Sequence, residues 1–452
     1  MSSTPVELIA QAVEYPPRPH HGLRAVVQSI VSKVAILALQ AATGILTART
    51  LGPAGRGELA AMILWPLFVA SVTTLGVPNS LIYHLRRRPE ERGQLIANGF
   101  VLAAVLGIIA AAVCAFILPR WLHEYPTRVI VAADWFLVTV PICSVTLAGR
   151  ALLEGSHDFS ASNAIQTLTP FATLLGLLAF LAMHWIDPYT AAIAYIAASV
   201  PAFLLMIVRV RRAGMGGVRV SGLAIKRILG YGIRCYGIDI LGTLALQVDQ
   251  VLVVSLLTPS AMGSYVVVLS LSRMLNLFQN SVVMVLFPKA AGRSREDVVA
   301  LTGGAARISS LVTAACGVFV CAAGPALLRI LYGPEYVGAV RALRILVVEV
   351  ILSGATFVLA QAFMALDRPG VVTILQAVGL SLSIPMMLWL IPRYGIYGAA
   401  ISLLTSTIAR LLFVCAGFRI FLKTSAPSLL PNVRDVRVLF GALSILHMES
   451  AA

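Results

Sequence analysis

The chain has 452 residues, of which 59% are hydrophobic and only 12% are charged, and its formal net charge is +15. Soluble domains carry about 25% charged residues, so this composition excludes a water-soluble globular protein. The positive charge alone is also typical of nucleic-acid-binding proteins. Lys and Arg accumulate in the cytoplasmic loops of membrane proteins as well, and their distribution along this chain favours that interpretation. We therefore expect no nucleic-acid partner.

The apolar residues are gathered into long runs separated by short polar breaks. A helix needs about 20 apolar residues to cross a hydrocarbon core of about 30 Å. These runs are too long and continuous for the alternating strands of a membrane β-barrel, which have about ten residues. The sequence predicts an all-α integral membrane protein with about twelve transmembrane helices, near residues 26–48, 58–82, 94–118, 129–153, 159–183, 188–208, 229–257, 262–288, 305–331, 345–366, 370–391 and 396–421.

The longest polar break between these runs, Arg209–Arg227, separates six helices from six. This break predicts two six-helix bundles joined by a basic linker. The resulting organisation is a cytoplasmic N-terminal tail, an N-terminal bundle, the linker, a C-terminal bundle and a cytoplasmic tail, at residues 1–24, 25–210, 211–228, 229–421 and 422–452. A short apolar patch at 438–446 is too short to span a bilayer. It is either an interfacial segment or the start of a further helix.

A short repeat supports the division into two halves. Leu51–Gly57 matches Leu257–Gly263 at a constant offset of 206 residues, with Leu, Pro and Gly recurring in place after the first helix of each half. Two halves of the same topology are related by a pseudo-two-fold axis along the membrane normal. Such repeats are typical of transporters and favour them over membrane enzymes.

The positive charges are distributed unevenly between the two sides of the predicted membrane. If the N-terminus is cytoplasmic, 21 Lys and Arg residues lie on the inner side and 8 on the outer side. Because positive loops stay in the cytoplasm, both termini are predicted to be cytoplasmic. The polar residues before His21 contain no signal-peptide hydrophobic region, so we expect the first apolar run to be retained.

No pattern of an enzyme or cofactor site is present. Gly214, Gly216 and Gly217 lack the GxxxxGK[ST] arrangement that holds nucleotide phosphates. The seven histidines lack metal-ligand spacing, and the six cysteines lie within apolar runs without a CxxC pair. We expect no catalytic residue, no metal and no cofactor, and therefore not an enzyme.

Ionisable residues inside the predicted helices are the most informative. A charge at the bilayer centre costs about 2.5–3.5 kcal/mol on insertion scales, so such residues should face a cavity or a partner. Lys33, Arg307 and Glu349 are close enough to helix ends to extend to the membrane surface instead. The complete set is Lys33, Asp239, Asp249, Arg273, Arg307, Glu349 and Arg410.

Some of these residues belong to polar stripes with helical spacing. One stripe of this kind is commonly a helix–helix contact, but three stripes on the first helix of each half and its neighbour favour a shared polar cavity. Lys33 and Asp239 also occupy equivalent positions, since they are 206 residues apart. The stripes are Ser29, Lys33, Gln40, Thr43 and Thr47; Tyr236, Asp239, Thr243 and Gln250; and Ser270, Arg273, Asn276 and Asn280.

Several short motifs resemble the polysaccharide transporter family, which contains the O-antigen-type flippases of the multidrug/oligosaccharidyl-lipid/polysaccharide exporter superfamily. They are Ala48–Leu59, Leu75–Val77, Gln247–Leu252 and Gly263–Tyr265, in that order. The resemblance implies two bundles in a V around a central cavity lined by helices 1, 2, 7 and 8. It also implies a substrate built on a polyprenyl diphosphate. Thr258 stands where the family commonly has Gly, and the cationic residues of relatives cannot be matched individually, so ion coupling stays open.

From these observations we expect a flippase of the bacterial cytoplasmic membrane. It would move a polyprenyl-diphosphate-linked oligosaccharide by alternating access, with membrane lipids and other polysaccharide-assembly proteins as further candidate partners. The predicted substrate-binding residues are Arg273, Asn276, Asn280, Arg307, Arg410 and Gln40, and the predicted ion-coupling or charge-pairing residues are Asp239, Asp249 and Lys33. The alternatives are a drug/cation antiporter of the same fold, which would need an acidic cavity, and a glycan polymerase or ligase, which would need a long external loop.

Overall fold

The computed structural model describes residues 19–156, 158–212, 220–290 and 293–428. These residues form helices joined by short turns, and no strand occurs among them. The predicted all-α class is therefore confirmed. The patch at 438–446, residues 1–18 of the predicted N-terminal tail and residues 213–219 of the predicted linker lie outside these residues.

The first half consists of helices of very different lengths, joined by short turns and two short 3-10 helices. Its elements are α2 (Pro19–Val72), α3 (Val77–Arg87), η1 (Pro89–Glu91), α4 (Arg92–Trp121), α5 (Thr127–Phe136), η2 (Leu137–Thr139), α6 (Val140–Gly155), α7 (Phe159–Ala182), α8 (Pro188–Ala197) and α9 (Ser199–Arg212).

The second half has a similar pattern. Its elements are α10 (Gly222–Leu256), α11 (Pro259–Arg273), α12 (Asn276–Ala290), α13 (Arg295–Leu327), η3 (Leu328–Tyr332), η4 (Pro334–Ala339), α14 (Val340–Ala365), α15 (Pro369–Tyr394) and α16 (Ile396–Phe421). Residues 222–228, which we assigned to the linker, form the first turns of α10.

The number of membrane spans among the described residues depends on how α2 and the bent pair α11 and α12 are counted. Ten helices are long and apolar enough to cross a membrane, or eleven when α11 and α12, bent by 43°, count as one span. The first of them, Val31–Val72, has 42 residues, which corresponds to about 63 Å and twice the hydrocarbon thickness. Gly52 interrupts it with φ 65° and ψ −178°. Dividing α2 at Gly52 gives twelve spans, in agreement with the prediction of about twelve.

The kink at Gly52 follows from its local sequence. Glycine adopts positive φ with little strain because it has no Cβ. Pro53 comes next, and proline is favoured at the first position of a helix because its missing N–H has no partner there in any case. Gly52-Pro53 therefore ends one helix and starts the next.

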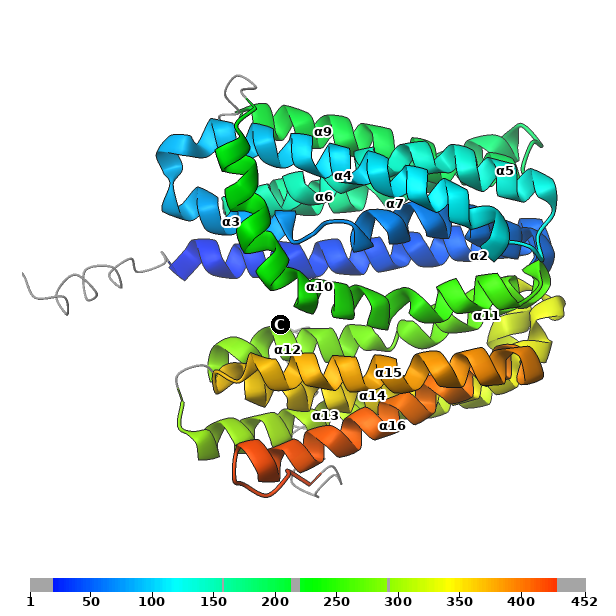
Figure 1. Cartoon of the computed structure of the whole chain (residues 1–452). Helices are drawn as coiled ribbons and strands as arrows, with labels where there is room; N and C mark the ends of the chain where they lie inside the picture. The colour runs from blue at the N-terminus through cyan, green and yellow to red at the C-terminus, as the bar shows by residue number, and fades with distance from the viewer. Residues whose placement is uncertain (1–18, 157, 213–219, 291–292, 429–452) are drawn as a thin grey trace, which may run out of the picture.

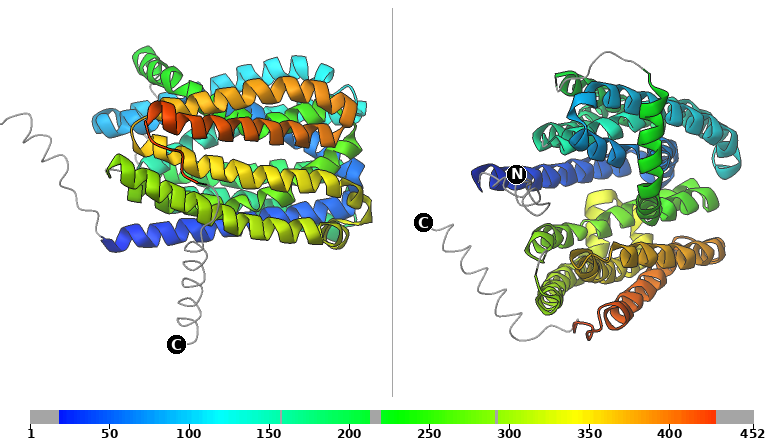
Figure 2. Two further views of the ribbon diagram at one scale, coloured as in Figure 1. Left: turned by 90° about the horizontal axis from the view of Figure 1, so that it is seen from below. Right: turned by 60° about the vertical axis from the view of Figure 1, so that its left-hand side comes forward.

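The helices are arranged in two lobes (Figure 1). The N-lobe contains α2–α9 and the C-lobe contains α11–α16, and Figure 2 shows the two lobes from further directions. Helix α10 runs between them (Figure 1). Its start is attached to the N-lobe, because Arg227 Nη1 lies 2.8 Å from Glu91 Oε2 and the Ser221 N–H donates to Asn98 Oδ1 at 2.8 Å.

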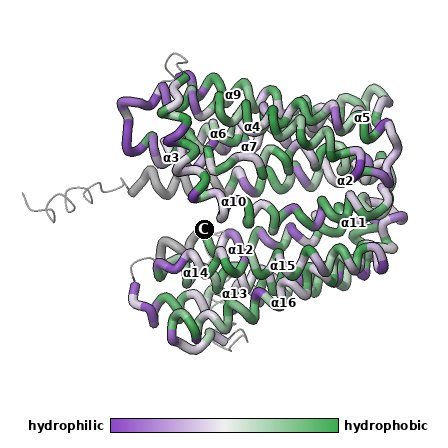
Figure 3. The backbone as a smooth tube through the Cα atoms, viewed as in Figure 1, coloured by the Kyte–Doolittle hydropathy of each residue, from purple (hydrophilic) through white to green (hydrophobic). Residues whose placement is uncertain are grey.

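The outer surface of the bundle is apolar. Phe116, Trp135 and Val318 are 74%, 74% and 70% exposed, which suits a surface that contacts lipid chains. Hydrophobic residues follow the helices along most of their length, and hydrophilic residues gather near the helix ends (Figure 3). This pattern is that of a multi-pass membrane protein.

The lobes are tightly packed at one end, which we call the sealed end. A Cβ on Gly57 would collide with the carbonyl oxygen of Pro259, and a Cβ on Gly263 would collide with that of Pro53. The two contacts are equivalent, since 53 and 57 become 259 and 263 on adding the repeat offset of 206. The repeated motif thus forms a pseudo-symmetric contact between α2 and α11.

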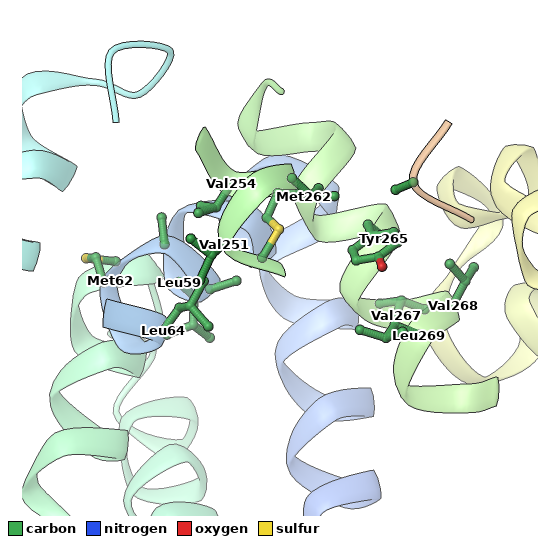
Figure 4. Close-up of a cluster of buried hydrophobic side chains, with 14 of the residues drawn as sticks. Leu59, Met62, Leu64, Val251, Val254, Met262, Tyr265, Val267, Val268 and Leu269 are labelled. Atoms are coloured by element: carbon green, nitrogen blue, oxygen red, sulfur yellow. The ribbon is translucent and has the colours of Figure 1, made fainter. Parts of the chain in front are cut away.

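Apolar side chains fill the space behind this contact. Leu59 and Met62 of α2 come together with Val254 of α10 and Met262 and Tyr265 of α11 (Figure 4). All of them are less than 5% exposed. The sealed end is consequently a packed core in which the helix backbones approach each other closely.

Candidate substrate cavity

The lobes diverge at the opposite end, which we call the open end. Helix α11 packs along α2, but after the 43° bend α12 packs on α13 and α14 of its own lobe. The bend therefore leaves a space between the first part of α2 and α12. This central cavity has a volume of about 540 Å³ and is lined by Lys33, Ile36, Leu37, Gln40, Arg273, Met274, Asn276, Leu277, Asn280, Ser281, Val283 and Phe357.

Five of the predicted site residues line this cavity together: Lys33, Gln40, Arg273, Asn276 and Asn280. The spacing of Lys33, Ile36, Leu37 and Gln40 is that of one helix face. The amide side chains can donate or accept hydrogen bonds. The cavity wall thus combines two cations with neutral polar groups and apolar side chains.

Arg273 is the last residue of α11 and has a carboxylate partner. Its Nη2 lies 3.0 Å from Asp249 Oδ2, and its Nη1 donates to the Leu246 carbonyl at 3.2 Å. The Tyr265 hydroxyl donates to the same Asp249 Oδ2 at 2.8 Å. Asp249 is fully buried, whereas the Arg273 side chain is 32% exposed. One side of the guanidinium is held by the protein and the remainder faces the cavity.

Lys33 has no carboxylate partner in the described structure, whereas Arg273 is paired with Asp249. It is exposed within the cavity wall, and among the described residues no carboxylate oxygen lies within 4 Å of its Nζ. Asp249 balances the charge of Arg273, so Lys33 gives the central cavity a net positive charge. Such a site favours an anionic ligand group.

A second charge pair lies inside the C-lobe. Arg410 Nη2 is 3.9 Å from Glu349 Oε1 and donates to Thr407 Oγ1 at 2.8 Å, while Thr407 donates to Glu349 at 2.7 Å. The absence of a side chain at Gly379 makes room for the Arg410 stem, because a Cβ there would lie 2.5 Å from Arg410 Cδ. Arg410 is not part of the central-cavity lining as described.

Arg307 also lies elsewhere. Its Nη1 is 3.5 Å from the carbonyl of Ser428, which follows α16, and it is not in the described lining of the central cavity. Neither Arg307 nor Arg410 therefore belongs to the described lining in which the other predicted substrate-binding residues meet.

Asp239 lines a second polar space, the N-lobe pocket. Its Oδ2 accepts a hydrogen bond from Asn79 Nδ2 at 2.7 Å. The pocket has a volume of about 470 Å³ and includes Arg150 and Glu154, whose charged groups are 3.7 Å apart. Leu246 lines this pocket, and its carbonyl accepts from Arg273. The bond between Arg273 and Leu246 therefore joins the walls of the two spaces.

Three residues that contribute to these polar contacts were not predicted as site residues from the sequence. Tyr265 occurs in the sequence analysis only as part of a motif, Asn79 is a neutral residue within the predicted second helix, and Arg150 contributes there only to the charge count. The four-residue spacing of Arg150 and Glu154 is a signal for a helical ion pair and could have identified them.

Hydrogen bonds also cross between the lobes at the sealed end. Arg49 Nε donates to the Leu331 carbonyl at 3.0 Å, and its Nη2 donates to the Ile330 carbonyl. The Tyr336 hydroxyl donates to the Ala48 carbonyl at 3.2 Å. These contacts close the sealed end in the same structure that has the central cavity accessible between α2 and α12.

The sequence profile described as polysaccharide biosynthesis protein matches residues 46–341, more than half of the chain. The chain belongs to the polysaccharide biosynthesis protein family. Because the matched residues begin before Gly52 and extend beyond Tyr336, they include the sealed end and most of the central-cavity lining. No curated protein sequence matches the chain.

Solved structures share the fold over most of its length. A lipid II flippase MurJ in an inward closed conformation has a TM-score of 0.75 at 13% identity, covering 94% of this chain and 92% of that one. An inward-facing multidrug resistance MATE transporter of the MOP superfamily has a TM-score of 0.67 at 15% identity, covering 89% of this chain and 100% of that one. An outward-facing multidrug resistance MATE transporter of the MOP superfamily has a TM-score of 0.60 at 15% identity, covering 89% of this chain and 95% of that one. The chain therefore has the two-lobed fold of MOP superfamily transporters.

Proposed function

We propose that this protein is a flippase that moves a polyprenyl-diphosphate-linked oligosaccharide across the bacterial cytoplasmic membrane. The observation that carries the proposal is the central cavity, which is cationic, partly polar, accessible at one end and closed at the other. Membership of the polysaccharide biosynthesis family supports a glycan substrate, and the shared fold with a lipid II flippase supports a lipid-linked one.

The cavity chemistry suits the diphosphate group. Lys33 supplies an unpaired positive charge, and the free side of the Arg273 guanidinium supplies planar donors that bind phosphate oxygens well. Gln40, Asn276 and Asn280 supply amide groups for sugar hydroxyls. The prenyl tail would stay in lipid beside the cavity, because moving its apolar surface from lipid into a polar, water-accessible space is unfavourable.

The two ends of the lobe interface supply the two gates of an alternating-access cycle. In the conformation described here, the sealed end blocks passage while the open end admits the substrate head group. The positive-inside distribution of Lys and Arg supports a cytoplasmic position for the open end. Reversal would separate Gly57 from Pro259 and bring α12 toward α2. Asp249 and Asp239 would serve as charge partners or carry a coupling proton.

The shared fold with MATE transporters keeps a drug/cation antiporter as the second candidate. A cationic drug would need an accessible acid in the cavity. Asp249 is instead buried and engaged by Arg273 and Tyr265, while Lys33 would repel the drug. A polymerase or ligase is disfavoured because the described connections at the sealed end, such as 122–126 and 183–187, are short.

The proposal is tested with purified protein in proteoliposomes that contain a labelled polyprenyl-diphosphate oligosaccharide. Transfer between leaflets is followed by the access of an added glycosidase, with an imposed ion gradient and no nucleotide. We expect protein-dependent transfer without ATP, since the chain has no phosphate-binding loop. Uptake of an organic cation without glycolipid transfer would support the antiporter instead.

A further inference from the structure

Arg56 is a buried cation that has no carboxylate partner among the residues that the structure describes. The residue is 8% exposed, and its Nε and Nη1 atoms are buried and make no hydrogen bond. Among the described residues, no carboxylate oxygen lies within 4 Å of its guanidinium. In the part of the chain that the structure describes, neither of these two buried nitrogens meets an acceptor that would explain why an arginine stands there.

The other interior arginines are arranged differently. Arg273, Arg410 and Arg150 each have a carboxylate within 4 Å, from Asp249, Glu349 and Glu154 respectively. An isolated buried charge is unfavourable. The unpaired state of Arg56 therefore destabilises the sealed conformation relative to one in which the guanidinium meets water or an anion.

Arg56 lies between the lobes at the sealed end. It belongs to the first turn after the kink at Gly52, where the positive end of a helix favours anions. Its guanidinium is in electrostatic range of the phenols of Tyr332 and Tyr336, which belong to the C-lobe. Separation of the lobes at this end would expose it on the wall of the resulting cavity.

We infer that Arg56 is an anion-binding residue of the conformation in which the sealed end is open, with a phosphate group as its ligand. This inference rests on the proposed function for the source of the phosphate, which would be the diphosphate of the lipid-linked substrate after transfer. Arg56 would then receive the anionic group as Lys33 and Arg273 release it.

The repeat supplies a suitable substitution. Arg56 corresponds to Met262 at the offset of 206, and Met262 is fully buried at the equivalent place on α11. Arg56→Met therefore gives the first half the same residue type that is buried at the equivalent position of the second half. Arg56→Lys retains the charge. Arg393 is a matched control, because it is exposed on α15 at the same end and rests on Trp389 at 4.5 Å.

The experiment measures lobe separation at the sealed end by electron–electron distance spectroscopy. Spin labels are placed at Ala54→Cys and Ser260→Cys, two exposed and equivalent positions on different lobes, after replacement of the six native cysteines. Inorganic pyrophosphate and a polyprenyl diphosphate are added separately. We expect each to raise the long-distance population, by about threefold, because a ligand that binds one conformation more tightly shifts the equilibrium toward it.

Arg56→Met should abolish this response and lower the long-distance population without ligand. Arg56→Lys should keep part of the response, and Arg393→Met should respond as the parent does. A full response by Arg56→Met, or no response by the parent to either probe, would overturn the inference. A response to the lipid alone assigns the ligand to the lipid head group. An Arg56-dependent response without glycolipid transfer would retain the anion site while rejecting the proposed substrate.

Discussion

The sealed and open ends of the lobe interface are built from different parts of the same helices. At the sealed end, Gly57 and Gly263 let backbones touch, and the contact obeys the internal repeat. At the open end, the bend after Arg273 turns α12 away from α2, and long polar side chains face the space between them. Closure here depends on missing side chains at positions that the repeat shares. The anion binding that we propose would depend instead on Lys33 and Arg273, whose equivalents at the offset of 206 are Asp239 and Leu67.

Removal of the Arg273 charge should have the largest effect, because it disrupts the wall of the open cavity. Arg273→Leu leaves Asp249 buried without its cation, and breaking a buried pair costs about 3–5 kcal/mol. We expect a sharp loss of folded protein, measured by size-exclusion chromatography after solubilisation. The double variant with Asp249→Asn should restore folded protein but transport glycolipid poorly. Normal transport by the double variant would remove Arg273 from the binding site.

The next effect concerns the sealed end. Gly57→Ala forces a Cβ into the Pro259 carbonyl, and overpacking of this kind costs about 1–3 kcal/mol. We expect a lower melting temperature or a larger open population at the sealed end, and a stronger effect when Gly263→Ala is added. Gly44→Ala is the control, since its Cβ would meet nothing within 4 Å. Equal behaviour of the Gly57 and Gly44 variants would show that close backbone contact is not what seals this end.

A substitution of Lys33 tests the role of charge at the open end without disturbing the packing of the helices. Its side chain is exposed and has no carboxylate within 4 Å in the described structure, so Lys33→Ala should leave the melting temperature unchanged. We expect affinity for a polyprenyl diphosphate to fall about tenfold, equivalent to ~1.4 kcal/mol, and the loss to shrink at high salt. Unchanged affinity measured by titration would place the anion elsewhere.

The smallest effect is expected outside the membrane, where Glu91 joins Arg88 at 3.1 Å and Arg227 at 2.8 Å. Partial desolvation raises the pKa of Glu91, but the hydrogen bonds and charges of Arg88 and Arg227 outweigh it and hold the pKa below its ordinary value. A lowered pKa means that the stabilisation is present above the pKa of the unfolded chain and is lost as pH falls through the folded pKa.

Glu91→Gln should therefore lower the melting temperature slightly at neutral pH, and the difference from the parent should vanish in acid. Glu90→Gln is the control, since Glu90 is exposed and has no cation within 4 Å in the described structure. A difference that persists at low pH would show that the ion pairs do not fix α10 to the N-lobe.

Much of the fold was readable because membrane helices are long and apolar, and the six-plus-six division followed from the polar break at Arg209–Arg227. The helical spacing of Arg273, Asn276 and Asn280 also predicted that they share a face, and the structure places them in one cavity. Spacing cannot show the order of helices around a lobe. The positions of Arg307 beside Ser428 and of Arg410 against Gly379 depend on that order. Arg56 was counted only as a loop charge, because the kink that turns it inward is a tertiary feature.

A cavity that binds a diphosphate must distinguish ligands by the charge of their head group. Equilibrium binding to the purified protein can be compared for a polyprenyl diphosphate, the matching monophosphate and the matching alcohol, with an organic cation as competitor. We predict that the diphosphate binds most tightly, the monophosphate less tightly and the alcohol least. Lys33→Ala should reduce the differences in affinity among these three lipids, and the organic cation should not displace the diphosphate. Equal affinity for all three lipids, or displacement by the cation, would contradict a diphosphate-binding cavity.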